Sequence, residues 1–202
     1  MIRIHGHPYS TFVRRVHIAL VEKNIPHEKI VVDMQAGEHR KPEYRKRNPY
    51  GRVPALEEDG FMLYESSAIL NYLEATHPTP ALVPADVRGR ALVDMHMKLC
   101  DLQMTRQTGT IIFPKRFLPK DRWIEADMAK AREEIEKHLA ILESDLGGAE
   151  YLVGGRYSLA DIAYIPFLEF LPLMEITPPP GIAAWREHLM ARPSSVATKP
   201  AQ

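Results

Sequence analysis

Three short segments of the chain carry polar groups that could together bind and activate a small thiol. Each lies where a predicted strand would lead into a helix, or a turn into a strand, so its hydroxyl groups would stand beside backbone N–H groups that lack a partner. No single segment contains enough chemistry for an enzyme, but the three together could hold one peptide-like thiol. The segments are Gly6-His7-Pro8-Tyr9-Ser10, Asn48-Pro49-Tyr50-Gly51-Arg52-Val53-Pro54 and Tyr64-Glu65-Ser66-Ser67-Ala68.

Ser10 is the candidate contact for the sulfur atom. It lies between a predicted strand and a predicted helix, so its hydroxyl and the first helical N–H groups would face an anion. Lowering the pKa of a thiol from about 8.5 by about 2 units requires roughly 2.7 kcal/mol of preferential stabilisation of the thiolate. A helix dipole contributes about 0.3–1 kcal/mol and a hydrogen bond to a charged group about 1.5–3 kcal/mol, so the hydroxyl would dominate. Tyr9 and Thr11 are rival hydroxyls, and a purely capping role for Ser10 is the alternative.

The composition argues against several other functions. The 202 residues include 26 basic and 26 acidic side chains, so the net charge gives no reason to expect nucleic acid or a membrane as a partner. No stretch approaches the roughly 20 apolar residues that span a bilayer, and we expect a cytoplasmic protein. Cys100 is the only cysteine, which excludes an intramolecular disulfide. His5 and His7 share a strand face without a third ligand, so no metal site is expected.

The periodicity of apolar residues changes once and divides the chain into two domains. Residues 1–76 combine short β-type runs with helical patterns, which indicates an α/β domain. Strands are predicted over 2–4, 27–32, 54–57 and 62–64, and helices over 11–23 and 66–74. Residues 77–86 contain three prolines that a helix could not accommodate, and we interpret them as a linker.

Residues 87–202 are predicted to form an all-helical domain. Helical spacing extends over 87–112, 122–146, 159–171 and 183–191, with no convincing strand between these stretches. Ser158 and Asp161 form a capping box at the start of the third stretch. Asp161 is therefore expected to be a folding determinant, and its removal should cost on the order of 1 kcal/mol or more.

The order and spacing of these motifs resemble the soluble glutathione transferases over nearly the whole chain. Arg14-Arg15-Val16 and Gly37-Glu38-His39 add to the three segments, and together they look most like serine-type, phi-class members. The resemblance implies an N-terminal thioredoxin-like domain and a C-terminal helical domain. It also implies a cytoplasmic, homodimeric detoxification enzyme that binds glutathione as co-substrate and directs its thiolate onto an apolar electrophile, with Ser10 as the catalytic residue.

The resemblance assigns the remaining groups to the parts of glutathione. The proline of Val53-Pro54 would be cis, and Val53 would pair with the cysteinyl part of the peptide. Ser66 would cap the third helix and receive the γ-glutamyl carboxylate, while Glu65 takes the ammonium group. His39 and Arg40 are the candidates for the remaining carboxylate. Arg52 departs from the resemblance, because phi-like members often carry Gln or a shorter polar residue at this position. Its guanidinium group could still reach a ligand carboxylate as a donor fork, or it could swing to solvent. An ordinary trans proline, a plain serine cap and a solvated basic loop are the alternatives.

The second substrate is less well defined by the sequence. An adaptable apolar pocket could be lined by methionines and aromatic residues of the helical domain. Tyr50 is the candidate aromatic residue that would insert into a partner subunit. The alternative is a tyrosine in a turn that packs on its own domain. The alternatives to a transferase are a non-catalytic glutathione-binding or protein-interaction module and a glutathione-dependent isomerase or peroxidase. The candidate pocket residues are Met95, Met97, Cys100, Met104, Thr108, Ile111, Ile112, Phe113 and Phe117.

Overall fold

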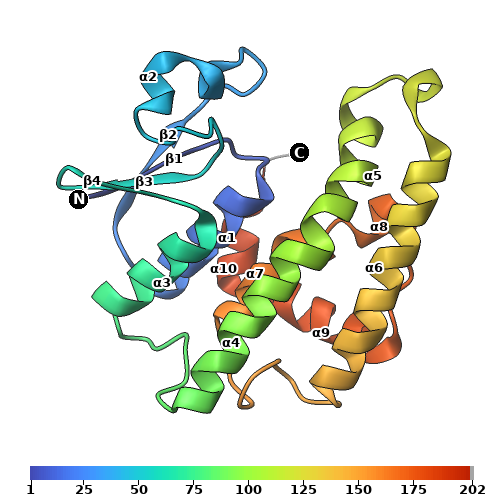
Figure 1. Cartoon of the computed structure of the whole chain (residues 1–202). Helices are drawn as coiled ribbons and strands as arrows, with labels where there is room; N and C mark the ends of the chain where they lie inside the picture. Colours follow the sequence, from blue (N-terminus) through green and yellow to red (C-terminus); the bar gives the residue numbers. More distant parts are fainter. Residues whose placement is uncertain (201–202) are drawn as a thin grey trace. The chain divides into compact units, whose positions relative to one another are not determined.

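The chain folds into two compact units. The computed structural model describes residues 1–200 (Figure 1). The first unit comprises residues 1–82 together with the segment that begins at Pro193, and the second comprises Val83–Arg192. The α/β class of the N-terminal half and the helical class of the C-terminal half are both confirmed.

The first unit is a four-stranded mixed sheet with helices. The strand order is β2-β1-β3-β4, in which β1 is parallel to β2 and antiparallel to β3, and β3 is antiparallel to β4. The elements in chain order are β1 (Ile2–Gly6), α1 (Thr11–Glu22), β2 (His27–Val31), a 3-10 helix (Glu38–Arg40), α2 (Pro42–Arg45), β3 (Ala55–Glu58), β4 (Phe61–Tyr64) and α3 (Ser66–Thr76).

Apolar and polar side chains alternate along β1, and this alternation decides which face of the sheet packs on the apolar core. Ile2 and Ile4 are buried and belong to one apolar core with residues of α1 and α3. These helices lie together on one face of the sheet in Figure 1. Arg3 and His5 point to the opposite face because successive side chains of a strand alternate. There both contact the carboxylate of Glu57, His5 through Nε2 at 2.9 Å and Arg3 through Nη1 at 3.1 Å.

The C-terminal cap of α1 fixes the start of the predicted linker. The Lys23 ammonium group donates to the carbonyl oxygens of His77 at 2.7 Å and Pro80 at 2.8 Å. It also lies 2.6 Å from the carboxylate of Glu74, and its side chain is fully buried. The Leu82 N–H donates in turn to the Glu74 carboxylate at 3.1 Å, which holds the backbone as far as Leu82 to the first unit. The chain therefore passes from the first unit to the second between Leu82 and Val83, inside the predicted 77–86 linker.

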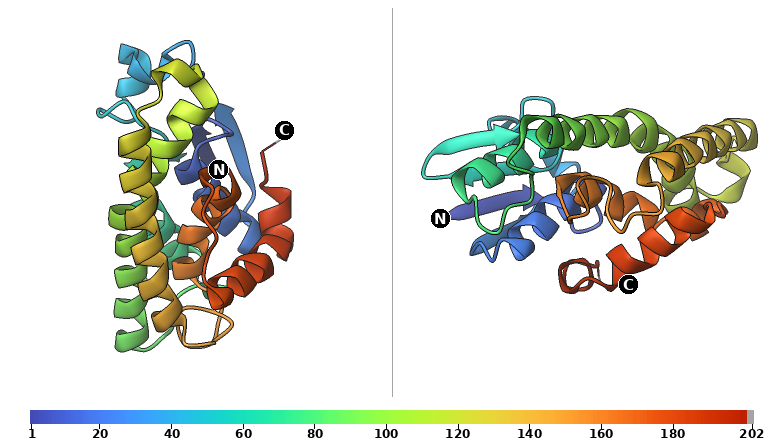
Figure 2. Two further views of the ribbon diagram at one scale, coloured as in Figure 1. Left: turned by 90° about the vertical axis from the view of Figure 1, so that its right-hand side faces the viewer. Right: turned by 90° about the horizontal axis from the view of Figure 1, so that it is seen from below.

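The second unit is a helical bundle built around one buried helix. All ten residues of α7 (Leu159–Leu168) are buried. In Figure 2, α7 lies between the layer that contains α4 and α6 and helix α9. The other elements are α4 (Val87–Leu99), a π-helical segment (Cys100–Met104), α5 (Thr105–Phe117), a 3-10 helix (Lys120–Arg122), α6 (Glu125–Leu146), α8 (Leu171–Met174) and α9 (Pro180–Ala191). No helix of residues 1–200 is both long and apolar enough to cross a bilayer.

The chain end does not join the helical unit to which the sequence assigned it. Helix α10 (Pro193–Ala197) belongs to the first unit, in which it packs against α1. Arg14 Nη2 donates to the Ser195 carbonyl at 3.3 Å, and the Ser194 hydroxyl donates to the Glu22 carboxylate at 2.5 Å. This grouping differs from the prediction that 87–202 form one helical domain. A five-residue helix gives no periodic pattern from which this packing could be predicted.

The capping box of α7 is confirmed and is part of a larger network. The Ser158 hydroxyl accepts from the Ala160 N–H at 3.2 Å, and the Asp161 carboxylate accepts from the Ser158 N–H at 2.9 Å. Asp161 also accepts from the Leu152 N–H and from the Trp185 indole N–H, both at 3.1 Å. Burial raises the pKa of Asp161, and these hydrogen bonds act against that shift.

We predict that Asp161→Ala lowers the free energy of unfolding by about 3–5 kcal/mol, because several buried donors lose their acceptor together. Urea denaturation measures this loss. Asp127→Ala, an exposed acidic residue in the first turn of α6, is the control and should cost less than about 1 kcal/mol. Equal losses in the two variants would show that the network does not stabilise the fold.

Candidate functional site

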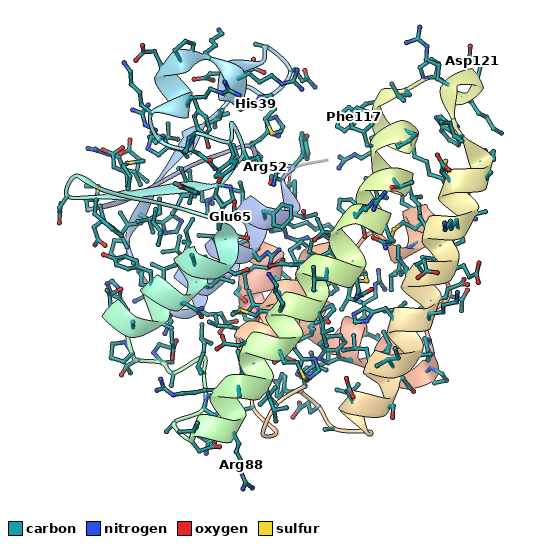
Figure 3. All side chains as sticks on the ribbon, in the orientation of Figure 1. His39, Arg52, Glu65, Arg88, Phe117 and Asp121 are labelled. Atoms are coloured by element: carbon teal, nitrogen blue, oxygen red, sulfur yellow. The ribbon has the colours of Figure 1, made fainter. Side chains whose placement is uncertain are left out.

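Two of the three predicted segments meet at one pocket of the first unit. The register of the sheet brings them together, because Ala55 pairs with His5 on one side and with Tyr64 on the other. The backbone before Ala55 and the backbone after Tyr64 therefore leave the sheet at the same edge. Arg52 and Glu65 are labelled on the same side of this unit in Figure 3. The pocket is lined by Phe12, Asn48, Arg52, Val53, Pro54, Glu65 and Ser66.

Ser10 occupies the N-cap position of α1. Its hydroxyl oxygen accepts from the Val13 N–H at 3.4 Å, so the capping interaction expected as the alternative is present. That bond uses the oxygen as an acceptor and leaves the hydroxyl proton to be donated elsewhere. Ser10 is half-buried and is not itself among the residues that line the pocket. The neighbouring hydroxyl of Tyr9 belongs to a side chain that is 44% exposed.

The Val53–Pro54 peptide bond is cis, as the resemblance implied. It immediately precedes β3, and within residues 1–200 no hydrogen bond engages the N–H or the C=O of Val53. An extended peptide could therefore pair with Val53 as an additional short strand. This is main-chain recognition, which does not depend on the identity of the ligand's side chains.

The turn before Val53 is held by residues that were not predicted as site residues. The Asn48 carboxamide and the Tyr44 hydroxyl both donate to the carbonyl oxygen of Arg52, each at 2.8 Å. Gly51 has a φ of 62°, and a β-carbon there would lie 2.9 Å from the carbonyl oxygen of His39, so the turn requires glycine. The Asn-Pro dipeptide at 48–49 marks the turn in the sequence, but nothing in the pattern pointed to Tyr44.

Glu65, rather than Ser66, occupies the N-cap position of α3. The predicted cap at Ser66 was wrong, since Ser66 is the first residue of the helix and is 4% exposed. Glu65 adopts a φ of 70° and a ψ of 113°, and its side chain makes no capping bond. Glu65 lines the pocket, next to the N–H groups of the first turn of α3 that have no partner within the helix. This pair of groups suits a ligand that carries both an ammonium and a carboxylate.

His39 and Arg40 lie in the 3-10 helix over Glu38–Arg40, outside the pocket lining. Burial lowers the pKa of His39, and the positive charge of Arg40 adds to this effect, so the imidazole is neutral at pH 7. Arg40 Nε donates to His39 Nε2 at 3.2 Å, while the buried Nδ1 of His39 has no partner among residues 1–200. A neutral imidazole can offer a hydrogen bond but no charge, so Arg40 and Arg52 are the cations among the three residues predicted to bind the remaining carboxylate.

Most of the helical residues proposed for an apolar pocket belong to the core of the second unit. Met97, Cys100, Met104, Thr108, Ile111 and Ile112 are all buried. Met95, Phe113 and Phe117 are exposed, and the rings of Phe113 and Phe117 lie 5.5 Å apart. The aromatic pair near the end of α5 is therefore the part of the predicted pocket lining that is exposed at the surface of this unit.

Glu65 is predicted to store backbone strain. A non-glycine residue at its φ costs about 1–3 kcal/mol, whereas glycine adopts this conformation without a steric penalty. We expect Glu65→Gly to raise the free energy of unfolding by about 1 kcal/mol. This net gain is the relieved strain less the cost of the greater conformational entropy of the unfolded glycine variant. Thermal unfolding measures the change. Glu65→Ala keeps the β-carbon and is the control, and a gain of equal size in that variant would contradict the strain.

Family models and full-length relatives agree with the geometry. The model for the glutathione S-transferase N-terminal domain matches residues 4–81, and the model for the C-terminal domain matches residues 110–193. The glutathione S-transferase F7 of Arabidopsis thaliana is 31% identical to the chain, with 96% of this chain and 97% of the relative covered. Glutathione S-transferase APIC of Nicotiana tabacum is 30% identical, with 96% and 95% covered. Both bear out the expected likeness to phi-class members.

Solved structures extend this similarity to the fold. Glutathione transferase F7 from Populus trichocarpa superposes with a TM-score of 0.88 at 30% identity, covering 98% of this chain and 97% of the other. A glutathione transferase homologue from Sulfitobacter with bound glutathione has a TM-score of 0.85 at 29% identity, with the same coverage. The pocket geometry, both domain models and the full-length relatives lead to one conclusion: the chain belongs to the glutathione S-transferase family.

Proposed function

We propose that the protein is a glutathione transferase that binds glutathione on its first unit and directs the thiolate onto an apolar electrophile. The observation that carries this proposal is the pocket itself. One carboxylate, one guanidinium group and the unpaired backbone of Val53 line the same small space. Glutathione carries an ammonium group, two carboxylates and a peptide backbone, so each of these features has a counterpart in the ligand.

Each part of glutathione is assigned to a group of complementary charge. We assign the ammonium group to Glu65 and the γ-glutamyl carboxylate to Ser66 at the positive end of α3. The cysteinyl backbone pairs with Val53, which cis Pro54 presents at the pocket. The glycyl carboxylate is assigned to Arg52 and Arg40, with His39 as a neutral hydrogen-bonding group. The exposure of both arginines in the free protein supports this assignment, because their guanidinium groups are accessible to a ligand.

Ser10 is the proposed catalytic residue. Its hydroxyl proton is available to a thiolate while its oxygen caps α1, and the helix dipole adds a smaller contribution of the same sign. A thiolate of lower pKa is present in larger amount at pH 7 but is less nucleophilic, with a Brønsted slope of about 0.4–0.5. The net activation is therefore modest, and positioning of the electrophile must supply much of the rate.

The electrophile is proposed to be an apolar molecule that contacts the second unit. Phe113 and Phe117 support this, because two large aromatic side chains that remain exposed on one helix provide apolar contact area at small entropic cost. The thiolate attacks the electrophilic carbon, a carbon–sulfur bond forms, and the leaving group departs with the displaced electron pair. Addition to an activated double bond requires a proton instead of a leaving group.

We predict that Ser10→Ala raises the pKa of bound glutathione by about 1–2 units, since it removes a charge-assisted hydrogen bond of about 1.5–3 kcal/mol. Thiolate absorbance in the ultraviolet, measured against pH at saturating glutathione, gives this pKa directly. Turnover should fall while the dissociation constant of glutathione changes little.

Tyr9→Phe and Thr11→Ala are the matched controls for this experiment, because each removes a rival hydroxyl from an adjacent position. A pKa that moves in one of these variants and not in Ser10→Ala would transfer the catalytic role to that residue. Glutathione that binds the wild type with an ordinary thiol pKa and without turnover would favour the non-catalytic binding module. Turnover with peroxides or isomerisable substrates alone would favour the other two glutathione-dependent activities.

A homodimer is the proposed assembly. Tyr50 is 67% exposed in the first unit, although the edge of its ring contacts Tyr64 with centroids 6.0 Å apart. In the second unit Leu92 and Met95 of α4 and Leu102 of the π-helical segment are each more than 40% exposed. These apolar side chains support an interface, because exposed apolar residues favour burial against a partner.

We predict that Tyr50→Ala and Leu102→Glu each shift the protein from dimer to monomer at micromolar concentration, because both remove apolar contact area from the interface. Sedimentation equilibrium measures the masses. Ile141→Glu is the control, since Ile141 is 58% exposed on α6 and lies outside this set. A wild-type monomer, or a control variant that dissociates equally, would contradict the interface. Cytoplasmic location and a role in detoxification complete the proposal and rest on the family alone.

A further inference from the structure

The carbonyl oxygen of Arg52 is held by two buried donors. The Tyr44 hydroxyl and the Asn48 carboxamide each donate to it at 2.8 Å, and these two residues are 4% and 1% exposed. A carbonyl that accepts two hydrogen bonds uses both of its lone pairs, so its orientation is strongly restricted. We refer to Tyr44, Asn48 and the Arg52 carbonyl as the Arg52 clamp.

The clamp also determines the direction of the neighbouring N–H. The peptide between Arg52 and Val53 is trans, so the N–H of Val53 points opposite to the carbonyl of Arg52. When the carbonyl is fixed toward Tyr44 and Asn48, the N–H is fixed away from them. This N–H has no partner within residues 1–200, and Val53 lines the pocket.

The clamp affects the strength of this donor as well as its direction. A peptide group whose carbonyl accepts hydrogen bonds is polarised, which makes its N–H a better donor. Both effects operate on the Val53 N–H, which is proposed to pair with the cysteinyl part of glutathione. The remaining interactions of Asn48 hold the turn itself, since its Oδ1 accepts from the Tyr50 N–H at 3.0 Å and its N–H donates to the Tyr44 carbonyl at 3.1 Å.

We propose that Tyr44 is a positioning residue for glutathione. Its hydroxyl holds the Arg52 carbonyl and thereby orients and polarises the Val53 N–H that binds the peptide. This inference rests on the proposed function for the identity of the ligand. Tyr44 does not line the pocket and lies one peptide group away from the ligand, so it contributes to affinity and not to the chemistry of the sulfur.

The test uses Tyr44→Phe, which removes one hydroxyl and retains the buried ring. We expect the dissociation constant and the KM for glutathione to rise about 3- to 10-fold, which is the effect of one neutral hydrogen bond. The kcat and the pKa of the bound thiol should stay as in the wild type. Titration calorimetry, steady-state kinetics and ultraviolet absorbance measure these quantities. Asn48→Ala is unsuitable alone, because it also removes the bond to Tyr50.

The matched control is Tyr72→Phe. Tyr72 lies in the same unit and its hydroxyl donates to the Glu58 carboxylate at 2.7 Å, but neither residue lines the pocket. This variant should lose a comparable amount of stability while its glutathione affinity is unchanged. A purely structural role for Tyr44 would give the two variants the same pattern, with lower thermal midpoints and unchanged affinities, and would overturn the inference.

A second readout does not need glutathione. The carbonyl 13C resonance of Arg52 in the free protein should move upfield in Tyr44→Phe and stay fixed in Tyr72→Phe, because only the first loses a bond to that carbonyl. An unmoved resonance in Tyr44→Phe would overturn the clamp. A moved resonance with unchanged affinity would overturn the positioning role alone. Wild-type protein that does not bind glutathione would instead overturn the proposed function and, with it, the ligand of this inference.

Discussion

The register of strand β3 is the constraint on which the binding surface of the first unit depends. Ala55 pairs with His5 of β1 on one side and with Tyr64 of β4 on the other. Three backbones are aligned at this residue, so the segments that leave the sheet there emerge at one edge. A shift of one residue would turn every side chain of the strand to the opposite face and would bury charged groups among the core. The apolar core therefore fixes the register, and the register fixes the position of Val53 relative to Glu65.

The proposed recognition of glutathione in this unit relies on backbone groups more than on side chains. Val53 offers an N–H and a C=O that have no partner in residues 1–200, and the first turn of α3 offers N–H groups at Ser66. Such groups are rigid, because their position follows from the sheet and the helix. Side-chain charges then select the ligand, and Glu65 and Arg52 are of opposite sign within one pocket. This division explains how a small site can be both preformed and specific.

Much of this architecture could be predicted because it follows from local signals. The change of periodicity separated the α/β half from the helical half, and the Asn48–Pro54 turn and the Tyr64–Ala68 segment both carry residue types typical of element ends. Five predicted site residues line the pocket as a result, namely Arg52, Val53, Pro54, Glu65 and Ser66, the last of which does not cap the helix as predicted. His39 and Arg40 lie in a short helix beside the turn, and their part in binding stays a prediction.

The remaining features could not be predicted, since they depend on contacts between residues distant from any motif. Phe12 faces the pocket although its residue type is typical of a core, and Tyr44 matters through a hydroxyl that no spacing rule identifies. Glu65 adopts a backbone conformation that propensity disfavours for a non-glycine residue. A glycine at this position would relieve the strain but would remove the carboxylate. Strained residues cluster at binding and active sites, so the conformation of Glu65 supports the proposal that its carboxylate faces a ligand.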